Sequence, residues 1–236
     1  MMVKPVIVLA GGLGTRLTPI TGGAIPKILA PVLGKPFLFY KLKSLYELGA
    51  REVVLLIGEL GEQVVDYVAN NELFGLKITC VSDGDVLSGT AGAIIKNLAM
   101  LPEFFWVTYG DTIVVTDLLA AQQFMATEGT NGLMCVLKNN DEYQTSNVDV
   151  SVNRVKTYEK NTKVGSHSYI DYGLLLFSKN AFTRPPHELP VDMKIVIDDL
   201  ITKNDLSAWE VDYRFWDIGT PEALLETENY LSKIFK

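Results

Sequence analysis

The chain has 236 residues, of which 48% are hydrophobic and 21% are charged, a composition typical of a globular protein. Its net charge of −7 argues against a nucleic-acid backbone or an anionic membrane surface as the main partner, because both attract basic faces. The chain shows no membrane-length apolar run and no signal-peptide pattern, and Cys80 and Cys135 lie inside short apolar runs. We therefore expect a single-domain cytoplasmic protein with reduced thiols.

The first predicted element is an apolar strand at 6–9, followed by a loop dense in glycine. Glycines let backbone N–H groups approach an anion closely, because no Cβ atoms intervene. An arginine adds a planar guanidinium and a lysine after a proline adds a compact ammonium, both suited to phosphate oxygens. The stretch therefore predicts a phosphate-binding loop, for which we select Leu9, Ala10, Gly11, Gly12, Gly14, Thr15, Arg16 and Lys27.

Two better-known glycine loops do not fit this stretch. A P-loop would need Gly-Lys-Ser/Thr after its four-residue spacer, whereas this loop ends in Gly14-Thr15-Arg16. The dinucleotide fingerprint would need a third glycine where Leu17 stands. The alternative to a phosphate site is a tight turn in which the glycines only bend the chain.

The segments LAGGLGTRL and PKILAPVLGKPFLFY resemble the signature of the sugar-phosphate nucleotidyltransferases, also called NDP-sugar pyrophosphorylases. The chain is most similar to short bacterial-type members such as heptose 1-phosphate guanylyltransferases and N-acetylmuramate 1-phosphate uridylyltransferases. The resemblance implies a magnesium-dependent reaction of a nucleoside triphosphate with a sugar 1-phosphate, giving an NDP-sugar and pyrophosphate. It also implies a Rossmann-like, doubly wound, mostly parallel α/β sheet with a small antiparallel sugar-binding insertion. The nucleotide half would cover about 1–130, and the sugar half about 131–236.

Helix and strand patterns alternate in the next part of the chain, as in a parallel α/β sheet. An apolar helical stripe runs over 36–48 between Pro36 and Gly49. Strands are predicted at 53–57 and 76–81, with a short helix at 63–68 between them.

A second loop rich in small and polar residues covers 82–92, before a helical stretch at 93–100. The family reads the base and ribose here, usually with P-L-G-T-A-G-A, and Gly89 to Ala93 keep the second half of that pattern. The resemblance therefore assigns Asp83, Gly89 and Thr90 to the nucleotide. An extra residue in the first half leaves the base open among GTP, CTP and UTP, and the alternative is a helix-capping glycine turn.

The predicted strand at 104–109 ends in Gly110-Asp111. An aspartate at the carboxyl end of a central strand is well placed to bind a hard cation. In the family the same Gly-Asp binds magnesium, so we predict that Asp111 is a Mg²⁺ ligand. The alternative is a turn or cap aspartate, but Thr116 or Asp117 fits the cap of the next helix better.

The pattern then changes to an antiparallel one. After a strand at 133–137, apolar and polar residues alternate over 148–152, and a further strand at 155–158 can pair with it. The segment from Val155 to Lys160 follows the family order V-x-x-F-x-E-K, although Glu-Lys alone would be read as a solvated pair. The resemblance implies that Glu159 binds sugar hydroxyls and Lys160 the sugar phosphate, with Asn147 beside them.

Asp171 and Gly173 interrupt an apolar strand predicted at 169–178. A buried carboxylate needs a partner, so we expect Asp171 to face a ligand or a hydrogen-bond donor. The resemblance adds both residues to the sugar-phosphate contacts, and a purely structural aspartate is the alternative. We expect His167 and His187 to be bystanders, because neither belongs to a nucleophile motif.

A core helix is predicted at 191–202, and a last helix begins after Thr220 and extends to about 235. The segment before it, Trp216 to Pro221, keeps most of the family pattern W-x-D-x-G-T-P. The resemblance makes Asp217 the second Mg²⁺ ligand.

The predicted reaction needs no general base, because a sugar phosphate is largely ionised at neutral pH. Positioning and electrostatics are then the main requirements. Two alternatives are a cytidylyltransferase acting on phosphocholine or a phosphonate, and a catalytically silent subunit that only binds a nucleotide or sugar phosphate. A homodimer is compatible with the sequence.

Overall fold

The computed structural model describes residues 2–12, 14–82, 88–183 and 189–235. The chain divides into two compact units, each assembled from three separate segments. Unit 1 comprises residues 1–4, 88–107 and 116–214, and unit 2 comprises residues 5–87, 108–115 and 215–236. Both units combine strands with helices, so the predicted α/β class is confirmed.

Unit 2 is built on a small parallel sheet with the strand order β5-β4-β1. The apolar run of β1 pairs with β4, Val6 lying opposite Val53, and both strands carry buried aliphatic side chains. The three strands lie within one residue of their predicted limits: β1 (Val6–Ala10), β4 (Glu52–Ile57) and β5 (Lys77–Ser82). The helices predicted next to them are also present, as α2 (Phe37–Glu47) and α3 (Gly61–Ala69).

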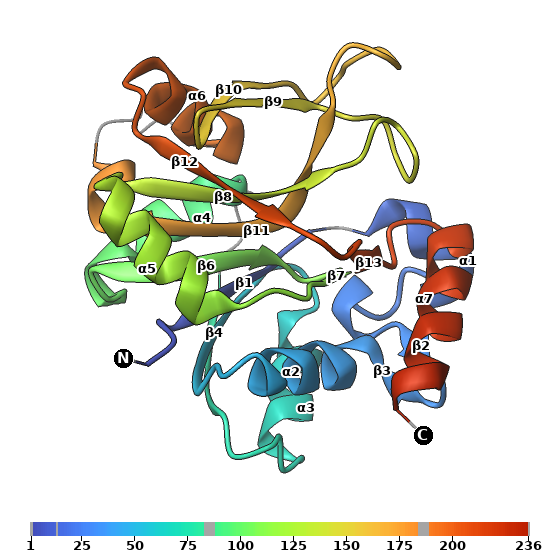
Figure 1. The fold of residues 1–236 in the computed structure, drawn as a ribbon. Coiled ribbons are helices and arrows are strands. Elements are labelled where there is room, and N and C mark those ends of the chain that lie inside the picture. The colour runs from blue at the N-terminus through green and yellow to red at the C-terminus, as the bar shows by residue number, and fades with distance from the viewer. Residues whose placement is uncertain (1, 13, 83–87, 184–188, 236) are drawn as a thin grey trace. The chain divides into compact units, whose positions relative to one another are not determined.

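A second core of unit 2 joins the two ends of the sequence. Leu17, Val32 and Phe37 from the N-terminal part pack with Ile218 and Leu224 from the C-terminal part. Figure 1 shows the last helix beside the short elements that follow β1. These elements are η1 (Thr15–Leu17), α1 (Thr18–Thr21), η2 (Lys27–Leu29), β2 (Pro31–Val32), β3 (Lys35–Pro36) and α7 (Pro221–Ile234).

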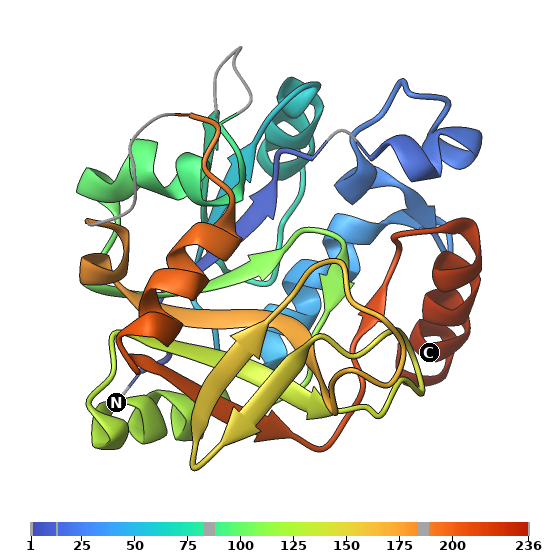
Figure 2. The same cartoon turned by 90° about the horizontal axis from the view of Figure 1, so that it is seen from above.

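Unit 1 contains a mixed sheet with the strand order β6-β11-β8-β12-β10-β9. β11 runs antiparallel to β8, whereas β12 runs parallel to it. The predicted antiparallel pair is present as β9 and β10, and the hairpin is visible in Figures 1 and 2. The strands are β6 (Phe104–Tyr109, whose last two residues belong to unit 2), β8 (Gly132–Lys138), β9 (Val148–Ser151), β10 (Arg154–Tyr158), β11 (Tyr169–Ser178) and β12 (Leu206–Val211).

Helices cover this sheet, and α5 and α6 lie on opposite sides of β8 and β12 (Figure 1). Asp117, one of the two cap residues that the sequence left open, caps α5 by accepting the Ala120 N–H at 3.0 Å. The helical segments of unit 1 are α4 (Thr90–Asn97), η3 (Leu98–Met100), α5 (Leu118–Glu128), η4 (Lys179–Phe182) and α6 (Met193–Thr202). Among the described residues, no helix combines the length and the apolar character that crossing a membrane requires.

Candidate functional site

Two very short strands of unit 2 bring the predicted metal ligands together. β7 (Thr112–Ile113) pairs with β13 (Trp216–Asp217), and Asp217 lies opposite Thr112. The Ile218 N–H also donates to the Asp111 carbonyl oxygen at 3.0 Å. Asp111 and Asp217 are far apart in the sequence, and this ladder makes them neighbours.

The Asp111 carboxylate is held by neighbouring donors. Lys27 Nζ lies 2.5 Å from Oδ2, and the Thr112 hydroxyl donates to Oδ1 at 3.0 Å. Burial alone would raise the pKa of Asp111, but the Lys27 ammonium, the Thr112 hydroxyl and Lys41 together hold it below its usual value. The carboxylate is therefore ionised at neutral pH although it is largely enclosed.

Gly14 lies directly against Lys27 in the glycine loop. It has a φ of +59°, and a Cβ atom built there would lie 2.8 Å from Lys27 Cβ. Gly12 has open space instead, with nothing within 4 Å of such an atom. Only a residue without a side chain fits at Gly14, which explains why the loop needs glycine there.

Arg16 lies beside Gly219, two residues after the second aspartate. A Cβ atom built on Gly219 would lie 3.9 Å from Arg16 Nη2 and 2.7 Å from Asp217 Oδ1, which already accepts the Gly219 N–H at 2.6 Å. Unit 2 thus gathers two cations and two carboxylates, which we call the phosphate-site cluster: Arg16, Lys27, Asp111 and Asp217. Leu9 is tied to the same region, because its carbonyl oxygen accepts the Gly110 N–H at 2.9 Å.

Lys41 is a polar residue near this cluster that the sequence analysis missed. Its side chain is fully buried in α2, and Nζ donates to Thr108 Oγ1 at 2.9 Å and to the Thr112 carbonyl oxygen. Burial lowers the pKa of Lys41 to about 7, and the nearby Asp111 carboxylate partly opposes that shift. The signal was present, because Lys41 falls three residues after Leu38 and four before Leu45 on the buried stripe of the helix.

The predicted sugar-phosphate residues lie in unit 1, where Asn147 connects two of them. The Asn147 carbonyl oxygen accepts the Glu159 N–H at 2.9 Å, and its side-chain Oδ1 accepts the Asp171 N–H at 2.9 Å. Asp171 Oδ1 in turn accepts the N–H of Gly173, which has a φ of +72°. These four residues therefore form one group.

Asp171 sits at a partly buried position of β11. Burial raises its pKa to about 6, while the Gly173 N–H, the Tyr158 hydroxyl and the Lys160 charge oppose the shift. Its enclosed carboxylate thus has donors on several sides within unit 1.

Lys160 makes an ion pair that the sequence did not suggest. Its Nζ lies 2.6 Å from Asp192 Oδ2, while Asp192 Oδ1 accepts the Lys194 N–H and caps α6. Burial alone would raise the pKa of Asp192, but Lys160 and the cap hydrogen bond hold it below its usual value. A capping aspartate before a helix was the only sequence signal for this partner.

His167, expected to be a bystander, lies between two carboxylates. Nδ1 is 2.9 Å from Asp149 Oδ2, and Nε2 is 3.9 Å from Glu159 Oε2. His187 and the predicted nucleotide residue Asp83 lie outside the described residues.

Gly89 and Thr90 make contacts within unit 1 that favour the structural alternative for this turn. A Cβ atom on Gly89 would lie 2.4 Å from the Val191 carbonyl oxygen, and Thr90 Oγ1 accepts the Met193 N–H at 2.8 Å. Both residues therefore fix the start of α4 against the start of α6. A role in nucleotide binding stays a prediction for them.

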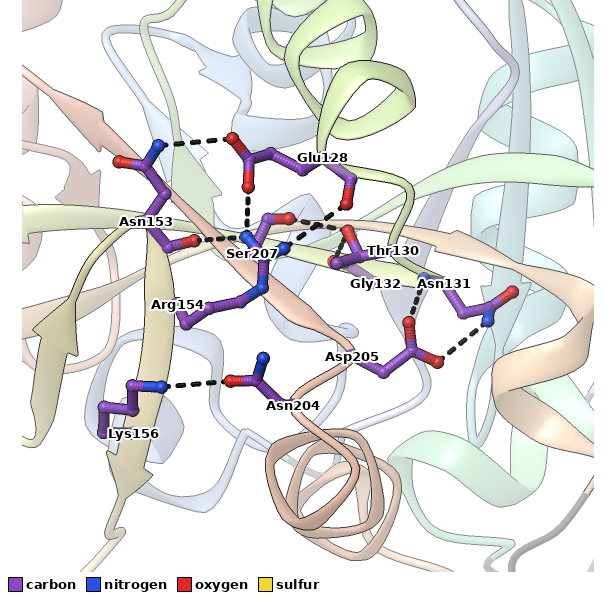
Figure 3. A network of polar contacts seen from close by, with 10 residues as sticks. All are labelled: Glu128, Thr130, Asn131, Gly132, Asn153, Arg154, Lys156, Asn204, Asp205 and Ser207. Atoms are coloured by element: carbon purple, nitrogen blue, oxygen red, sulfur yellow. Dashed lines mark hydrogen bonds and ion pairs between the residues drawn. The ribbon is translucent and has the colours of Figure 1, made fainter.

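A polar network fixes the β9–β10 hairpin to the rest of unit 1 (Figure 3). Arg154 pairs with Glu128 at the end of α5, and Asn153 Nδ2 donates to the same carboxylate at 3.2 Å. Lys156 Nζ donates to Asn204 Oδ1 at 3.0 Å. The hairpin that ends just before Glu159 is thus anchored at its turn and along β10.

The donor set of the phosphate-site cluster fits magnesium bound together with a phosphate ligand. Magnesium in phosphate-transfer sites is held by one or two carboxylates plus phosphate oxygens and water. In the part of the chain that the structure describes, no three His, Cys, Asp or Glu side chains are grouped so as to hold a metal by themselves. Asp111, in the turn just before β7, and Asp217, on the paired strand β13, supply two ionisable carboxylates, so they fit the first arrangement.

Comparison with known proteins agrees with these features. The family described as Nucleotidyl transferase matches residues 5–233. The chain belongs to this family. The predicted family is therefore confirmed.

Two curated relatives match over nearly their whole length. The chain is 32% identical over 221 residues to D-glycero-alpha-D-manno-heptose 1-phosphate guanylyltransferase of Campylobacter jejuni, covering 92% of this chain and 95% of the relative. It is 29% identical over 247 residues to the "Probable glucose-1-phosphate cytidylyltransferase" of Bacillus subtilis, covering 93% of both. The crystal structure of HddC from Yersinia pseudotuberculosis superposes with a TM-score of 0.80 at 24% identity, covering 97% of this chain and 99% of that one. At this identity the likeness concerns the fold.

Proposed function

We propose that this protein transfers a nucleotidyl group from a nucleoside triphosphate to a sugar 1-phosphate, releasing pyrophosphate and forming an NDP-sugar. The observation that carries the proposal is the phosphate-site cluster, in which a lysine, an arginine and two carboxylates meet after a glycine loop. The names of both full-length relatives describe transfer to a sugar 1-phosphate, which supports the acceptor class. Their bases differ, so the base stays open among GTP, CTP and UTP.

The triphosphate belongs to the glycine loop of unit 2 in this proposal. The amides between Leu9 and Thr15 bind phosphate oxygens, and Arg16 neutralises the pyrophosphate that leaves. Lys27 turns from Asp111 to the α-phosphate, where negative charge develops during transfer. Asp83, Gly89 and Thr90 belong to the nucleotide contacts of the same proposal.

Asp111 and Asp217 would hold magnesium, and the ion, when bound, neutralises phosphate charge. The ionised state of Asp111 supports this role, since a protonated carboxyl is a poor cation ligand. Lys27 pairs with the same carboxylate and keeps its charge compensated without the ion.

The sugar 1-phosphate belongs to unit 1 in this proposal. Lys160 binds the phosphate, while Asn147, Glu159, Asp171 and Gly173 surround the hydroxyl groups. The β9–β10 hairpin is then the sugar-binding insertion of a doubly wound, Rossmann-like fold. Neither unit is a continuous segment, so we treat residues 1–236 as one nucleotidyltransferase domain. The cytoplasmic location is part of the same proposal.

The test is pyrophosphate release with Mg²⁺, in which GTP, CTP, UTP, ATP and dTTP are each combined with a panel of sugar 1-phosphates and with phosphocholine. At least one pair should give turnover that Lys27→Ala and Asp111→Asn each reduce by about 100-fold or more. Lys27→Ala removes the positive charge proposed to stabilise the α-phosphate, and Asp111→Asn removes a carboxylate proposed to hold the magnesium ion. Lys77→Ala, which changes an exposed lysine of β5, serves as the matched control. Binding of a triphosphate without turnover on any sugar 1-phosphate would favour the catalytically silent subunit. Turnover with phosphocholine alone would favour the cytidylyltransferase alternative.

A further inference from the structure

We propose that Lys41 is a positioning residue that holds the turn carrying Asp111 in its ligand-binding geometry. The inference rests on the proposed role of Asp111, and it assigns to a buried residue of α2 a function in binding the metal and triphosphate. Lys41 takes no part in the phosphate contacts described above.

The first argument is the position of the two hydrogen-bond acceptors of Lys41 in the sequence. Its amine donates to Thr108 Oγ1, three residues before Asp111, and to the Thr112 carbonyl oxygen, one residue after it. One side chain thus ties both ends of the turn to helix α2. A neutral amine also carries two N–H donors, so this arrangement holds in either protonation state.

The second argument is that other groups fix the middle of the same turn. The Gly110 N–H donates to the Leu9 carbonyl oxygen at 2.9 Å, and a Cβ atom on Gly110 would also lie 2.9 Å from that oxygen. On the other side, the Ile218 N–H donates to the Asp111 carbonyl oxygen. Together with the two hydrogen bonds of Lys41, these contacts hold the backbone of 108–112 from three separate segments of the chain. The Asp111 carboxylate is then the group of this turn that we propose is presented for binding.

The third argument is energetic. Enclosing an amine and its acceptors in a core contributes little to stability, and apolar residues of similar volume often do as well or better. Most of the other buried side chains of α2 are apolar, among them Leu38, Leu42 and Leu45, and Ser44 adds one hydrogen bond to the Val114 carbonyl oxygen at 3.3 Å. Apolar contacts can therefore hold much of this helix, and a fully buried lysine among them is explained better by the turn it holds than by the packing of the helix.

The experiment separates positioning from packing with two variants. Lys41→Met removes the amine and leaves both Thr108 Oγ1 and the Thr112 carbonyl oxygen without this donor. The double variant Lys41→Met/Thr108→Val also replaces the Thr108 hydroxyl by a methyl group, so that only the Thr112 carbonyl oxygen loses its partner. Lys43→Met changes a partly exposed lysine of the same helix and is the control. Three quantities are measured: the melting temperature, amide exchange of 108–112 without ligand, and the Mg²⁺ concentration for half-maximal turnover.

We expect the double variant to melt within about 3 °C of the wild type, since the apolar pair replaces the polar one. We also expect at least about tenfold faster exchange of the 110–112 amides and at least about a tenfold higher Mg²⁺ requirement, a loss equivalent to about 1.4 kcal/mol of binding. Lys43→Met should change none of the three quantities.

Unchanged exchange and Mg²⁺ requirement in the double variant would overturn the proposal. So would a failure of both variants to fold, because Lys41 would then be an anchor of the fold. A wild type without any Mg²⁺-dependent turnover would refute the proposed function instead, and the exchange measurement, made without ligand, would still decide whether Lys41 holds the turn.

Discussion

Gly14 is the residue at which the conformation of the glycine loop and the position of Lys27 depend on each other. Its backbone has a positive φ, and the space of a Cβ atom is taken by Lys27 Cβ. We expect Gly14→Ala to lose most pyrophosphate-release activity, because the methyl group displaces the lysine or the loop. Gly22→Ala is a matched control, since Gly22 has a similar φ of +63° but open space around it.

Both glycine variants should lose about 1–2 kcal/mol of stability from the strained backbone. Only Gly14→Ala should lose activity beyond that shared effect. Thermal unfolding and the activity assay, performed on both variants, make the comparison. Equal activity of the two variants would show that the contact with Lys27 does not matter.

Asp171 leads to a prediction about pH. Its pKa is raised from 3.8 to about 6 in the folded protein, so between these values the folded state binds more protons than the unfolded state. The contribution of this group to stability is therefore largest below about pH 4 and falls as the pH rises to about 6. Asp171→Asn should remove that part of the pH dependence.

The measurement is the free energy of unfolding in urea from pH 4 to pH 7. Relative to Asp171→Asn, the wild type should lose stability across this range. Asp199→Asn, on the surface of α6 and paired with Lys203, should leave the curve parallel to that of the wild type. Parallel curves for Asp171→Asn would contradict the assigned environment.

Among single residues, the sequence is most informative about those whose role is local, such as a helix cap. The sequence placed a helix cap at Thr116 or Asp117 because a helix pattern follows directly, and the structure shows that Asp117 is the cap. Lys41 and Asp192 were missed because their partners come from distant segments. A lysine among leucines or an aspartate before a helix does not reveal which group it meets.

At the scale of elements, the β9–β10 hairpin depends on the network of Figure 3. The Arg154 side chain is only 17% exposed, and its Nε has no partner among the described residues, so the Glu128 carboxylate is its main counter-charge. Glu128→Ala would leave an enclosed guanidinium without that carboxylate and loosen the hairpin turn. We expect a lower melting temperature and a several-fold higher KM for the sugar 1-phosphate, with an unchanged KM for the nucleotide.

Glu52→Ala provides the control for that variant, because Glu52 pairs with Lys77 on an exposed part of β4 and β5. It should leave both KM values unchanged. If Glu128→Ala raised the two KM values equally, the effect would be a general loss of stability. The hairpin would then have no special link to the sugar.

The sequence predicted the strands that have a clear pattern of apolar residues, and it missed the strands without such a pattern. The strands at β1, β4, β5, β6 and β11 agree with the sequence within one residue at each end, because their apolar runs are uninterrupted or nearly so. β12 was not predicted, since Leu206–Val211 mixes serine, alanine and glutamate without strict alternation. β7 and β13 have only two residues each, too few for any period, although their pairing brings Asp111 and Asp217 together.

At the scale of the whole molecule, local sequence patterns do not predict which segments make up each unit. The chain runs through six alternating segments, and the strand β6 begins in unit 1 and ends in unit 2. Unit 2 closes its core only when α7 joins residues near the start of the chain. Tertiary packing decides which distant segments share a core. The sequence motifs identify only the loops and strand ends in which the predicted site residues lie.

This interleaving predicts that the two units unfold together. Neither unit can complete its core from one continuous segment, so partial unfolding would break strands and cores of both. The three tryptophans provide separate probes: Trp106 and Trp209 lie in unit 1, whereas Trp216 stacks on Tyr230 in unit 2.

Two variants separate these fluorescence signals. Trp216→Phe keeps only the tryptophans of unit 1, so its fluorescence reports on unit 1. Trp106→Phe/Trp209→Phe keeps only Trp216, so its fluorescence reports on unit 2. In each variant, the urea midpoint measured by fluorescence should coincide with the midpoint measured by far-UV circular dichroism. If the fluorescence of one variant changed well before its circular dichroism, the unit that this fluorescence reports on would unfold alone.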